Sequence, residues 1–280
     1  MEGVQTVLRL TVTFHMMEGF FDDQYIGCTE EMETLAPEIL KKEKMASAKF
    51  ETQWNEAAEV WESSKTYLKN IPEGFKDEYG IALLTFWFLD LNSTISILND
   101  FSRFGPDPKS FRYHSLHFYL TRALSLLRPG CGGKLVTVYQ DLHNFQVQKP
   151  LPPEVRFPGF GLFITNKESK KENGDLSLII NTCFGMKMLQ FSVFPSVKGL
   201  LIPMNEVFRV RSYDEVENQI IIESTYRKCS YYNCAYLGGT KSPNCSHIIR
   251  SSAPPIMKFS DAVMLPLVVA ASVAISWATS

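Results

Sequence analysis

The sequence has almost no excess charge of either sign. Its 280 residues include 28 Lys and Arg against 30 Asp and Glu, which gives a formal net charge of -2. A near balance gives no general attraction to polyanions, so we expect no nucleic-acid partner. The sequence also lacks internal repeats and low-complexity tracts. Its composition, 45% hydrophobic and 21% charged, is that of a globular protein rather than a disordered or fibrous one.

The chain is long enough to fold without covalent cross-links. A domain of this size buries roughly three quarters of the surface that its unfolded chain exposes. The linker-like stretch 149–153 is rich in proline but too short to separate two domains. We therefore expect one domain, and we expect the protein to be a monomer.

The six cysteines lack the C-x-x-C spacing of zinc sites and of thioredoxin-like redox sites. No histidine cluster accompanies Cys229 and Cys234, which lie five residues apart, so we expect no metal. Two interpretations stay open. An even number of cysteines suits disulfides, which require an oxidising compartment, and the alternative is six buried free thiols in a cytosolic protein. The six are Cys28, Cys131, Cys183, Cys229, Cys234 and Cys245.

The C-terminal segment has the pattern of a signal for a glycosylphosphatidylinositol anchor. Small residues at 251–253 are followed by a short spacer, and 262–278 is uncharged and mostly apolar. We expect attachment at Ser251 or Ser252 and removal of the tail, residues 251–280. Because no basic cluster follows the tail and it is somewhat short for a span, a membrane-spanning helix is less well supported. An amphipathic core helix is the third alternative.

The N-terminus lacks the uninterrupted apolar run of a signal peptide. Val4 to Phe14 is partly apolar, but Arg9 interrupts it and Glu2 precedes it. Either the signal is missing from this sequence or the start is misassigned. We favour a missing signal, because an anchor signal requires a signal for secretion, and we interpret residues 1–19 as a remnant or misannotated signal region.

Two short motifs match the acceptor pattern for N-linked glycans. They begin at Asn92, in Asn-Ser-Thr, and at Asn244, in Asn-Cys-Ser. Such patterns often arise by chance, so each gives mild support for a secreted glycoprotein. We expect glycosylation at both positions.

The first half of the sequence predicts helices. Apolar residues recur at helical spacing from Phe50 to Trp61 with charged residues between them, and 81–89 is apolar nearly all round, as in a buried helix. A third stripe of leucines, 116–127, ends before a Pro-Gly pair. His114 and His117 lie on or near this helix, and we interpret them as surface or core residues rather than ligands.

The second half predicts strands. It contains segments rich in β-branched and aromatic residues, separated by turn signals. Helices first and strands afterwards indicate an α+β fold rather than an alternating α/β fold. The predicted strands are Leu135 to Tyr139, Phe160 to Thr165, Leu176 to Thr182, Leu189 to Phe194, Gly199 to Tyr213 and Gln219 to Tyr226.

Four segments resemble the vertebrate ecto-ADP-ribosyltransferases, in that family's order. The resemblance runs from about Phe20 to about Cys245, and it implies an ADP-ribosyltransferase-like domain over residues 20–250. The segments 205–208 and 229–245 look most like the third paralogue, whose catalytic motifs are degenerate. The four matching segments are Phe21 to Cys28, His117 to Leu124, Thr137 to Tyr139 and Leu201 to Pro203.

The resemblance implies a chemistry and a substrate. The family transfers ADP-ribose from NAD to a protein side chain, usually arginine, through a transition state that resembles an oxocarbenium ion. An arginine after the first core strand binds the phosphates of NAD. A serine turn orients NAD. The second glutamate of a Glu-x-Glu pair stabilises the developing cation, and the first favours arginine as acceptor.

The residues at these places differ from the family pattern. Gln140 occupies the place of the arginine, and a neutral amide cannot replace the charge or the bidentate fork of a guanidinium. Thr165 keeps a hydroxyl in the place of the first serine and is the one weak candidate for NAD binding. Val197 and Gly199 occupy the places of the two glutamates, and Lys198 between them adds positive charge where the transition state also gains it.

A substitute for the missing glutamates is hard to find in the sequence. Between Glu172 and Glu206 the only carboxylate is Asp175. Glu206 follows the Leu-Ile-Pro strand, where relatives often have a glutamate, and we interpret it as structural. The family resemblance also implies how the cysteines pair, namely Cys28–Cys234, Cys131–Cys183 and Cys229–Cys245.

Three functions compete. The first is a lipid-anchored surface protein with this fold, without arginine transferase activity, that acts as a binding module for an extracellular protein. The second is an active NAD-arginine ADP-ribosyltransferase or NAD-cleaving enzyme that uses unfamiliar residues, Thr165 among them. The third is a structural glycoprotein whose ancestral cleft binds nothing. We favour the first, and whether NAD binds is left open.

Overall fold

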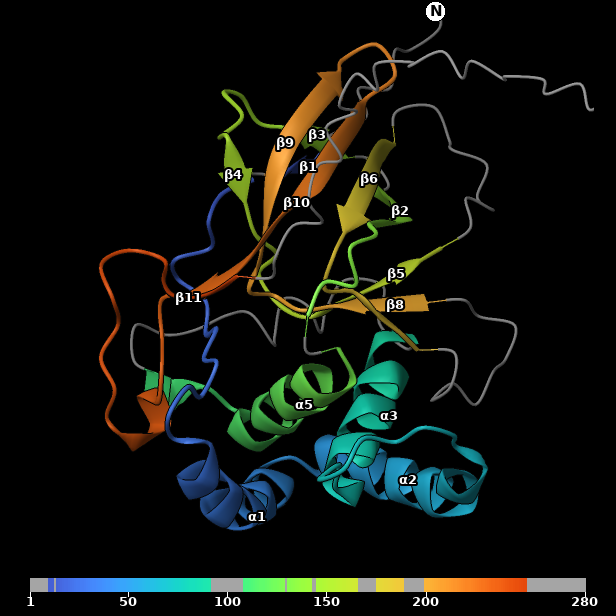
Figure 1. Cartoon of the computed structure of the whole chain (residues 1–280), viewed down its shortest axis with the longest axis vertical. Helices are drawn as coiled ribbons and strands as arrows, with labels where there is room; N and C mark the ends of the chain where they lie inside the picture. Colours follow the sequence, from blue (N-terminus) through green and yellow to red (C-terminus); the bar gives the residue numbers. More distant parts are fainter. Residues whose placement is uncertain are drawn as a thin grey trace, which may run out of the picture.

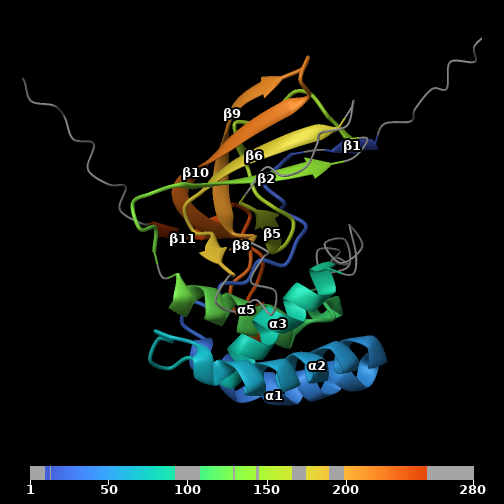
Figure 2. The ribbon, with the colours of Figure 1, turned by 90° about the vertical axis from the view of Figure 1, so that its right-hand side faces the viewer.

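The structure is a computed structural model that describes residues 10–12, 14–91, 108–128, 130–142, 145–165, 175–188 and 199–250 (Figure 1). The helices pack as one layer below a large twisted sheet, and the strands form the upper part of the molecule (Figure 2). The predicted α+β fold, with a helical first half and a β-rich second half, is confirmed.

Four α-helices of the described chain form the lower layer. In α2 the predicted apolar stripe is buried, and the side chain of Ser47 caps the helix by accepting a hydrogen bond from the Phe50 N–H at 3.3 Å. α3 packs closely on α2, because a Cβ at Gly80 would lie 2.2 Å from the Trp61 ring. The helices are α1 (Thr29–Ala46), α2 (Ala48–Ser64), α3 (Asp77–Leu91) and α5 (His114–Leu127), with 3₁₀ turns η1 (Lys65–Tyr67), η2 (Pro108–Ser110) and η3 (Ala235–Leu237).

The larger sheet has nine strands within the described residues, in the order β4-β9-β10-β6-β2-β5-β8-β7, with β11 paired to β10. A separate parallel pair joins β1 (Leu10–Val12) to β3 (Phe145–Val147). The larger sheet contains β2 (Val136–Leu142), β4 (Glu154–Val155), β5 (Gly161–Ile164), β6 (Leu176–Thr182), β7 (Met186–Lys187), β8 (Gly199–Ile202), β9 (Glu206–Asp214), β10 (Gln219–Ser230) and β11 (Ser246–Arg250).

One predicted strand is two strands in the structure. We predicted a continuous strand over Gly199 to Tyr213, but β8 ends at Ile202 and β9 begins at Glu206. Pro203 cannot donate a backbone hydrogen bond to a neighbouring strand, and its carbonyl accepts from the Glu206 N–H at 3.2 Å in a turn. The predicted strand over Leu189 to Phe194 lies outside the described residues.

Two hydrophobic cores lie on the two faces of the sheet. The larger one joins the helices to the sheet and contains the aromatic residues of α2, α3 and α5. The smaller one, with Val138 and Phe208, covers the other face of the central strands. His114 and His117 are buried in the larger core, and the Nδ1 atom of His117 hydrogen-bonds the Tyr25 hydroxyl at 2.9 Å. Of the two alternatives left by the sequence, surface or core, the structure shows the core.

Several positions singled out in the sequence lie outside the described residues. They are Asn92, Val197, Lys198, Ser251, Ser252 and the whole tail 251–280. Across the described ranges, the model contains no helix that combines the length and the apolar character needed to cross a membrane.

Candidate functional site

The strand register brings together the positions that the sequence singled out. β5 lies between β2 and β8, and Ile164 pairs with Tyr139 on one side and with Gly199 on the other. We call these three paired residues the three-strand row. Gln140 and Thr165 each follow a member of the row by one residue, and neighbouring strands lie about 4.8 Å apart. Residues far apart in sequence therefore meet at one place on the sheet.

The side chains at this place are neutral. Gln140 is half-buried, and its amide donates to the backbone carbonyl of Asp141 at 3.2 Å. Thr165 is half-buried and follows the last residue of β5. Gly199 is buried and carries no side chain at all. Of the four positions carried over from the family pattern, the three that the structure describes supply an amide, a hydroxyl and no side chain.

A carboxylate near the row escaped the sequence reasoning. Asp141 follows Gln140 directly, and its Oδ1 atom accepts a hydrogen bond from the Ser177 hydroxyl at 2.6 Å. Ser177 belongs to β6, which pairs with β2 on the side opposite to β5. The Asp141 carboxylate is thus held toward β6, away from Gly199. Nothing in the sequence alone distinguished it from a solvated strand residue.

Glu206 has the structural role that we predicted. Its side chain is fully buried and accepts hydrogen bonds from the Thr182 hydroxyl at 2.6 Å and from the Cys183 N–H at 2.8 Å. Burial raises its pKa, and hydrogen bonds from Ser224 and Thr182 counteract that rise. The carboxylate therefore holds the turn after β6 and does not stand at the three-strand row.

Two cavities in the described part lie away from the row. One of about 50 Å³ lies between α5 and the turns of the sheet, and His117, Asn205 and Lys228 are among its lining residues. This volume is large enough for a few water molecules and too small for a dinucleotide. The other, about 530 Å³, lies between α1 and the start of α5, beside Glu43 and Tyr236. Neither is lined by the members of the row.

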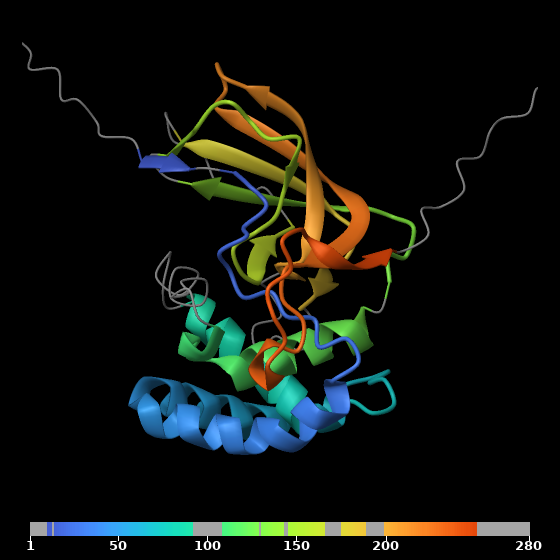
Figure 3. The ribbon, with the colours of Figure 1, turned by 90° about the vertical axis from the view of Figure 1, so that its left-hand side faces the viewer.

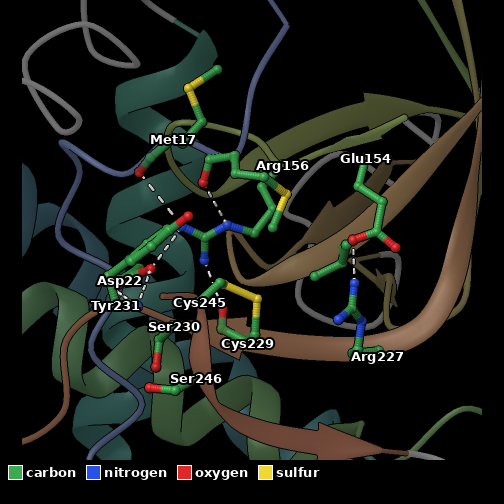
Figure 4. The surroundings of a disulfide bond; sticks show 12 residues. Met17, Asp22, Glu154, Arg156, Arg227, Cys229, Ser230, Tyr231, Cys245 and Ser246 are labelled. Atoms are coloured by element: carbon green, nitrogen blue, oxygen red, sulfur yellow. Dashed lines mark hydrogen bonds and ion pairs between the residues drawn. A yellow bond between two sulfur atoms is a disulfide. The ribbon is translucent and has the colours of Figure 1, made fainter. Parts of the chain in front are cut away.

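The segment that resembles the family's opening signature forms a buried network, which we call the N-terminal clasp. It consists of Asp22, Asp23 and Arg156 with the backbone groups that they bind. Asp22 and Arg156 form a fully buried ion pair at 2.7 Å. Figure 4 shows the two side chains facing each other. Asp22 also accepts from the N–H groups of Tyr231 and Tyr232, at 2.9–3.0 Å. Burial raises the pKa of Asp22, and the Arg156 charge counteracts it.

The rest of the clasp ties the same segments together. Asp23 accepts from the N–H groups of Cys234 at 2.9 Å and Ala235 at 2.7 Å. Arg156 donates to the Met16 carbonyl at 2.9 Å and to the Cys229 carbonyl at 2.7 Å. Figure 3 shows the segment before α1 running beside the chain that follows β10. No pattern in the sequence singles out Arg156, which is one of several arginines in strand-like surroundings.

The structure has three disulfides, Cys28–Cys234, Cys131–Cys183 and Cys229–Cys245. These are the pairs that the family resemblance implied. The first joins the segment before α1 to the chain after β10, beside the clasp, and the third lies next to the Arg156 side chain (Figure 4). No cluster of metal-ligating side chains occurs among the described residues.

The helices lie in a layer below a mixed sheet, and the three-strand row gathers the singled-out positions in that sheet. This is the fold that the family resemblance implied. The family model of NAD:arginine ADP-ribosyltransferases matches residues 14–230. The chain belongs to this family.

Relatives and solved structures agree with this membership. Human ecto-ADP-ribosyltransferase 5 is 37% identical over 240 residues, which cover 80% of this chain and 81% of the relative. Human ecto-ADP-ribosyltransferase 3 is 34% identical, over 82% of this chain and 61% of the relative. The crystal structure of the mono-ADP-ribosyltransferase ART2.2 is 32% identical, with a TM-score of 0.69 over 80% of this chain and 99% of that chain. A mutant of that enzyme, 31% identical, was solved in complex with NAD.

These identities do not separate the third paralogue from the fifth. The expected likeness to the third, with its degenerate motifs, stays a prediction.

Proposed function

We propose that this chain is an extracellular, lipid-anchored protein with an ADP-ribosyltransferase fold that does not transfer ADP-ribose to arginine. In this proposal it acts as a binding module for another extracellular protein. The observation that carries the proposal is the neutrality of the three-strand row. Its neighbours Gln140 and Thr165 carry no charge, and Gly199 has no side chain.

The chemistry explains why this neutrality matters. Cleavage of the bond between nicotinamide and ribose builds positive charge on the ribose, which a carboxylate stabilises. Loss of one preorganised group costs about 10²–10³-fold in rate in well-studied active sites. Gly199 removes the carboxylate, Val197 removes its companion, and Gln140 removes the cation that would bind the phosphates. With all three absent, transfer would fall below detection.

The extracellular location rests on separate observations. The relatives named above are ecto-enzymes. Three disulfides suit an oxidising compartment. Asn244 is exposed, as a glycan acceptor must be, and we propose glycans there and at Asn92. Digestion with an N-glycosidase should reduce the apparent mass of the secreted protein, and Asn244→Gln should remove part of that shift.

The lipid anchor is supported by the sequence pattern of residues 251–278. We propose a domain over residues 20–250, attachment at Ser251 or Ser252, and removal of the tail. Cells that express the chain should release it when treated with a phospholipase specific for phosphatidylinositol. Persistence of the protein on the treated cells would favour the membrane-spanning alternative.

A second candidate function is an active NAD-arginine transferase or NAD-cleaving enzyme. Family membership over residues 14–230 favours it, together with the hydroxyl of Thr165. Purified protein incubated with labelled NAD and arginine-rich acceptors decides between the two. Labelled acceptor would support the enzyme, and unlabelled acceptor would support the binding module. Titration of NAD by calorimetry shows separately whether a nucleotide pocket is retained.

A further inference from the structure

The place of the missing glutamate is filled by neighbouring side chains. A Cβ built on Gly199 would lie 2.9 Å from Cδ1 of Leu162 and 3.4 Å from the Trp87 ring. Cβ atoms in proteins are essentially never found closer than 3.0 Å to such an atom, so Leu162 would have to move. A side chain at this place therefore requires the end of the Leu162 side chain to shift, while the Trp87 ring lies at ordinary contact distance.

The backbone of Gly199 cannot move away from this contact cheaply. On one side it pairs with Ile164 of β5, and on the other its carbonyl accepts a hydrogen bond from the Met188 N–H at 3.0 Å. A shift of the strand would weaken hydrogen bonds on both sides. Relief must come from the two side chains that fill the space.

Leu162 and Trp87 differ in how easily they can change conformation. Leu162 lies opposite Leu201, so it is the diagonal neighbour of residue 199 on the same face of the sheet. It is half-buried and has rotamers to choose from. Trp87 is fully buried in α3 and has no room to turn. Whether a side chain fits at residue 199 therefore depends on Leu162.

We infer that Leu162, in the rotamer that it adopts in this structure, takes up space that a side chain at residue 199 needs. This inference rests on the proposed function, in which residue 199 has lost a carboxylate, and it predicts that Leu162 hinders the return of one. It makes Leu162 a packing determinant of the inactive site, and it predicts that restoring the family's charged residues alone is insufficient.

A cycle of four proteins tests the packing without any activity measurement. It compares Gly199→Ala, Leu162→Ala, the double variant and the natural chain by thermal unfolding. In the natural chain, Gly199→Ala should lower the unfolding midpoint by about 2–4 °C, because overpacking strains the core. In the Leu162→Ala background the same change should be neutral or raise the midpoint, because alanine restricts the unfolded chain.

A matched glycine provides the control. A Cβ at Gly159 meets no atom within 4 Å. Gly159→Ala should therefore shift the midpoint by the same amount with Leu162 present or absent. If Gly199→Ala also shifts the midpoint equally in both backgrounds, Leu162 does not close the position and the inference is wrong.

Restoration of activity extends the same comparison. The triple variant Gln140→Arg, Val197→Glu and Gly199→Glu is compared with the same protein carrying Leu162→Ala, and nicotinamide release from NAD is measured. At least tenfold faster release by the quadruple variant supports the inference. Equal release by both, or none by either, counts against Leu162 as the obstacle. If the natural chain itself modifies arginine, the proposed function fails, while the unfolding midpoints still decide on the packing.

Discussion

The N-terminal clasp and the three-strand row treat charge in opposite ways. The clasp keeps two buried aspartates and a buried arginine. The aspartates accept hydrogen bonds from backbone N–H groups, the arginine donates to a backbone carbonyl, and Asp22 forms an ion pair with Arg156. The row has an amide beside it at Gln140 and a bare backbone at Gly199. One region is rich in charge, and in the proposed function the other has lost the charge that the family uses.

The contrast separates charges that stabilise the fold from charges that serve a reaction. A buried charge whose partner is removed is left uncompensated, which costs several kcal/mol, so the clasp cannot lose a member without loss of stability. At the three-strand row, β2, β5 and β8 are paired without any charged side chain at Gln140 or Gly199. In the proposed function, this sequence keeps the signatures of the fold while it loses those of the reaction.

The largest effect should come from the disulfide beside the clasp. Cys28–Cys234 closes a loop of 206 residues and Cys229–Cys245 one of 16. On the chain-entropy estimate their removal costs about 5 and about 3 kcal/mol respectively. Paired Cys→Ser variants, unfolded in urea, should show this order. If removal of Cys229–Cys245 costs more than removal of Cys28–Cys234, the clasp segment is not held by the Cys28–Cys234 bridge.

Breaking the clasp itself should cost nearly as much. Asp22→Ala leaves the Arg156 guanidinium buried without its partner, so we expect a loss of about 3–5 kcal/mol in the free energy of unfolding. The control is Glu223→Ala, which breaks the exposed ion pair with Arg211 and should cost at most about 1 kcal/mol. Equal losses in the two variants would contradict the assignment of a structural role to the clasp.

Acid should weaken the core next to the clasp. Burial lowers the pKa of His117 to about 3, from an ordinary value of 6.5. The unfolded chain therefore binds this proton first, and stability falls as the pH drops from about 6.5 toward 3. His117→Gln, whose amide can still bond Tyr25, should remove up to about 3 kcal/mol of the loss at pH 4. Urea unfolding at pH 7, 5.5 and 4 measures it.

Two neighbours must be taken into account in that experiment. His114 also has a pKa lowered by burial, to about 4, and its loss of stability adds to that of His117. Burial raises the pKa of Glu43 to about 7, so its contribution is present below about 4.5 and is lost as the pH rises through 7. The comparison is therefore repeated in a Glu43→Gln background. An unchanged acid slope in His117→Gln would refute the prediction.

The smallest effect should come from the residue beside the row. Gln140 is half-buried, and its amide donates only to the carbonyl of the next residue in the described contacts. Gln140→Ala should change the free energy of unfolding by less than about 0.5 kcal/mol, as is usual for a side chain with no buried partner. A loss approaching that of Asp22→Ala would show that Gln140 had taken on a structural role in place of the family's arginine.

Periodicity predicted α2, α3 and α5 and the strands β2, β5, β6, β8, β9 and β10, because apolar stripes such as Phe50 to Trp61 are mostly buried, but α1 was not predicted. It did not predict the break at Pro203, because the residues on both sides have the same strand-like composition. The disulfides and the positions near the row followed from the family resemblance, since pairing across more than two hundred residues leaves no local pattern. The buried partners of Arg156 lie too far away in sequence to be predicted at all.

The same limit applies to the packing around residue 199. A glycine in sequence indicates that a carboxylate is absent, but only the structure shows Leu162 and Trp87 in the space that a side chain would need. Likewise, Asp141 is a carboxylate next to Gln140 in sequence, and only the register shows that it bonds Ser177 on the far side of β2.

The most direct test of the account is transfer of labelled ADP-ribose from NAD to an arginine-rich acceptor by the purified, disulfide-bonded chain. An active mono-ADP-ribosyltransferase of the family serves as the positive control, and the heat-denatured chain gives the background. The account predicts that acceptor labelling by this chain stays at the background while the control labels strongly. Arginine-linked label above the background, abolished by Thr165→Ala, would contradict it and identify an active enzyme.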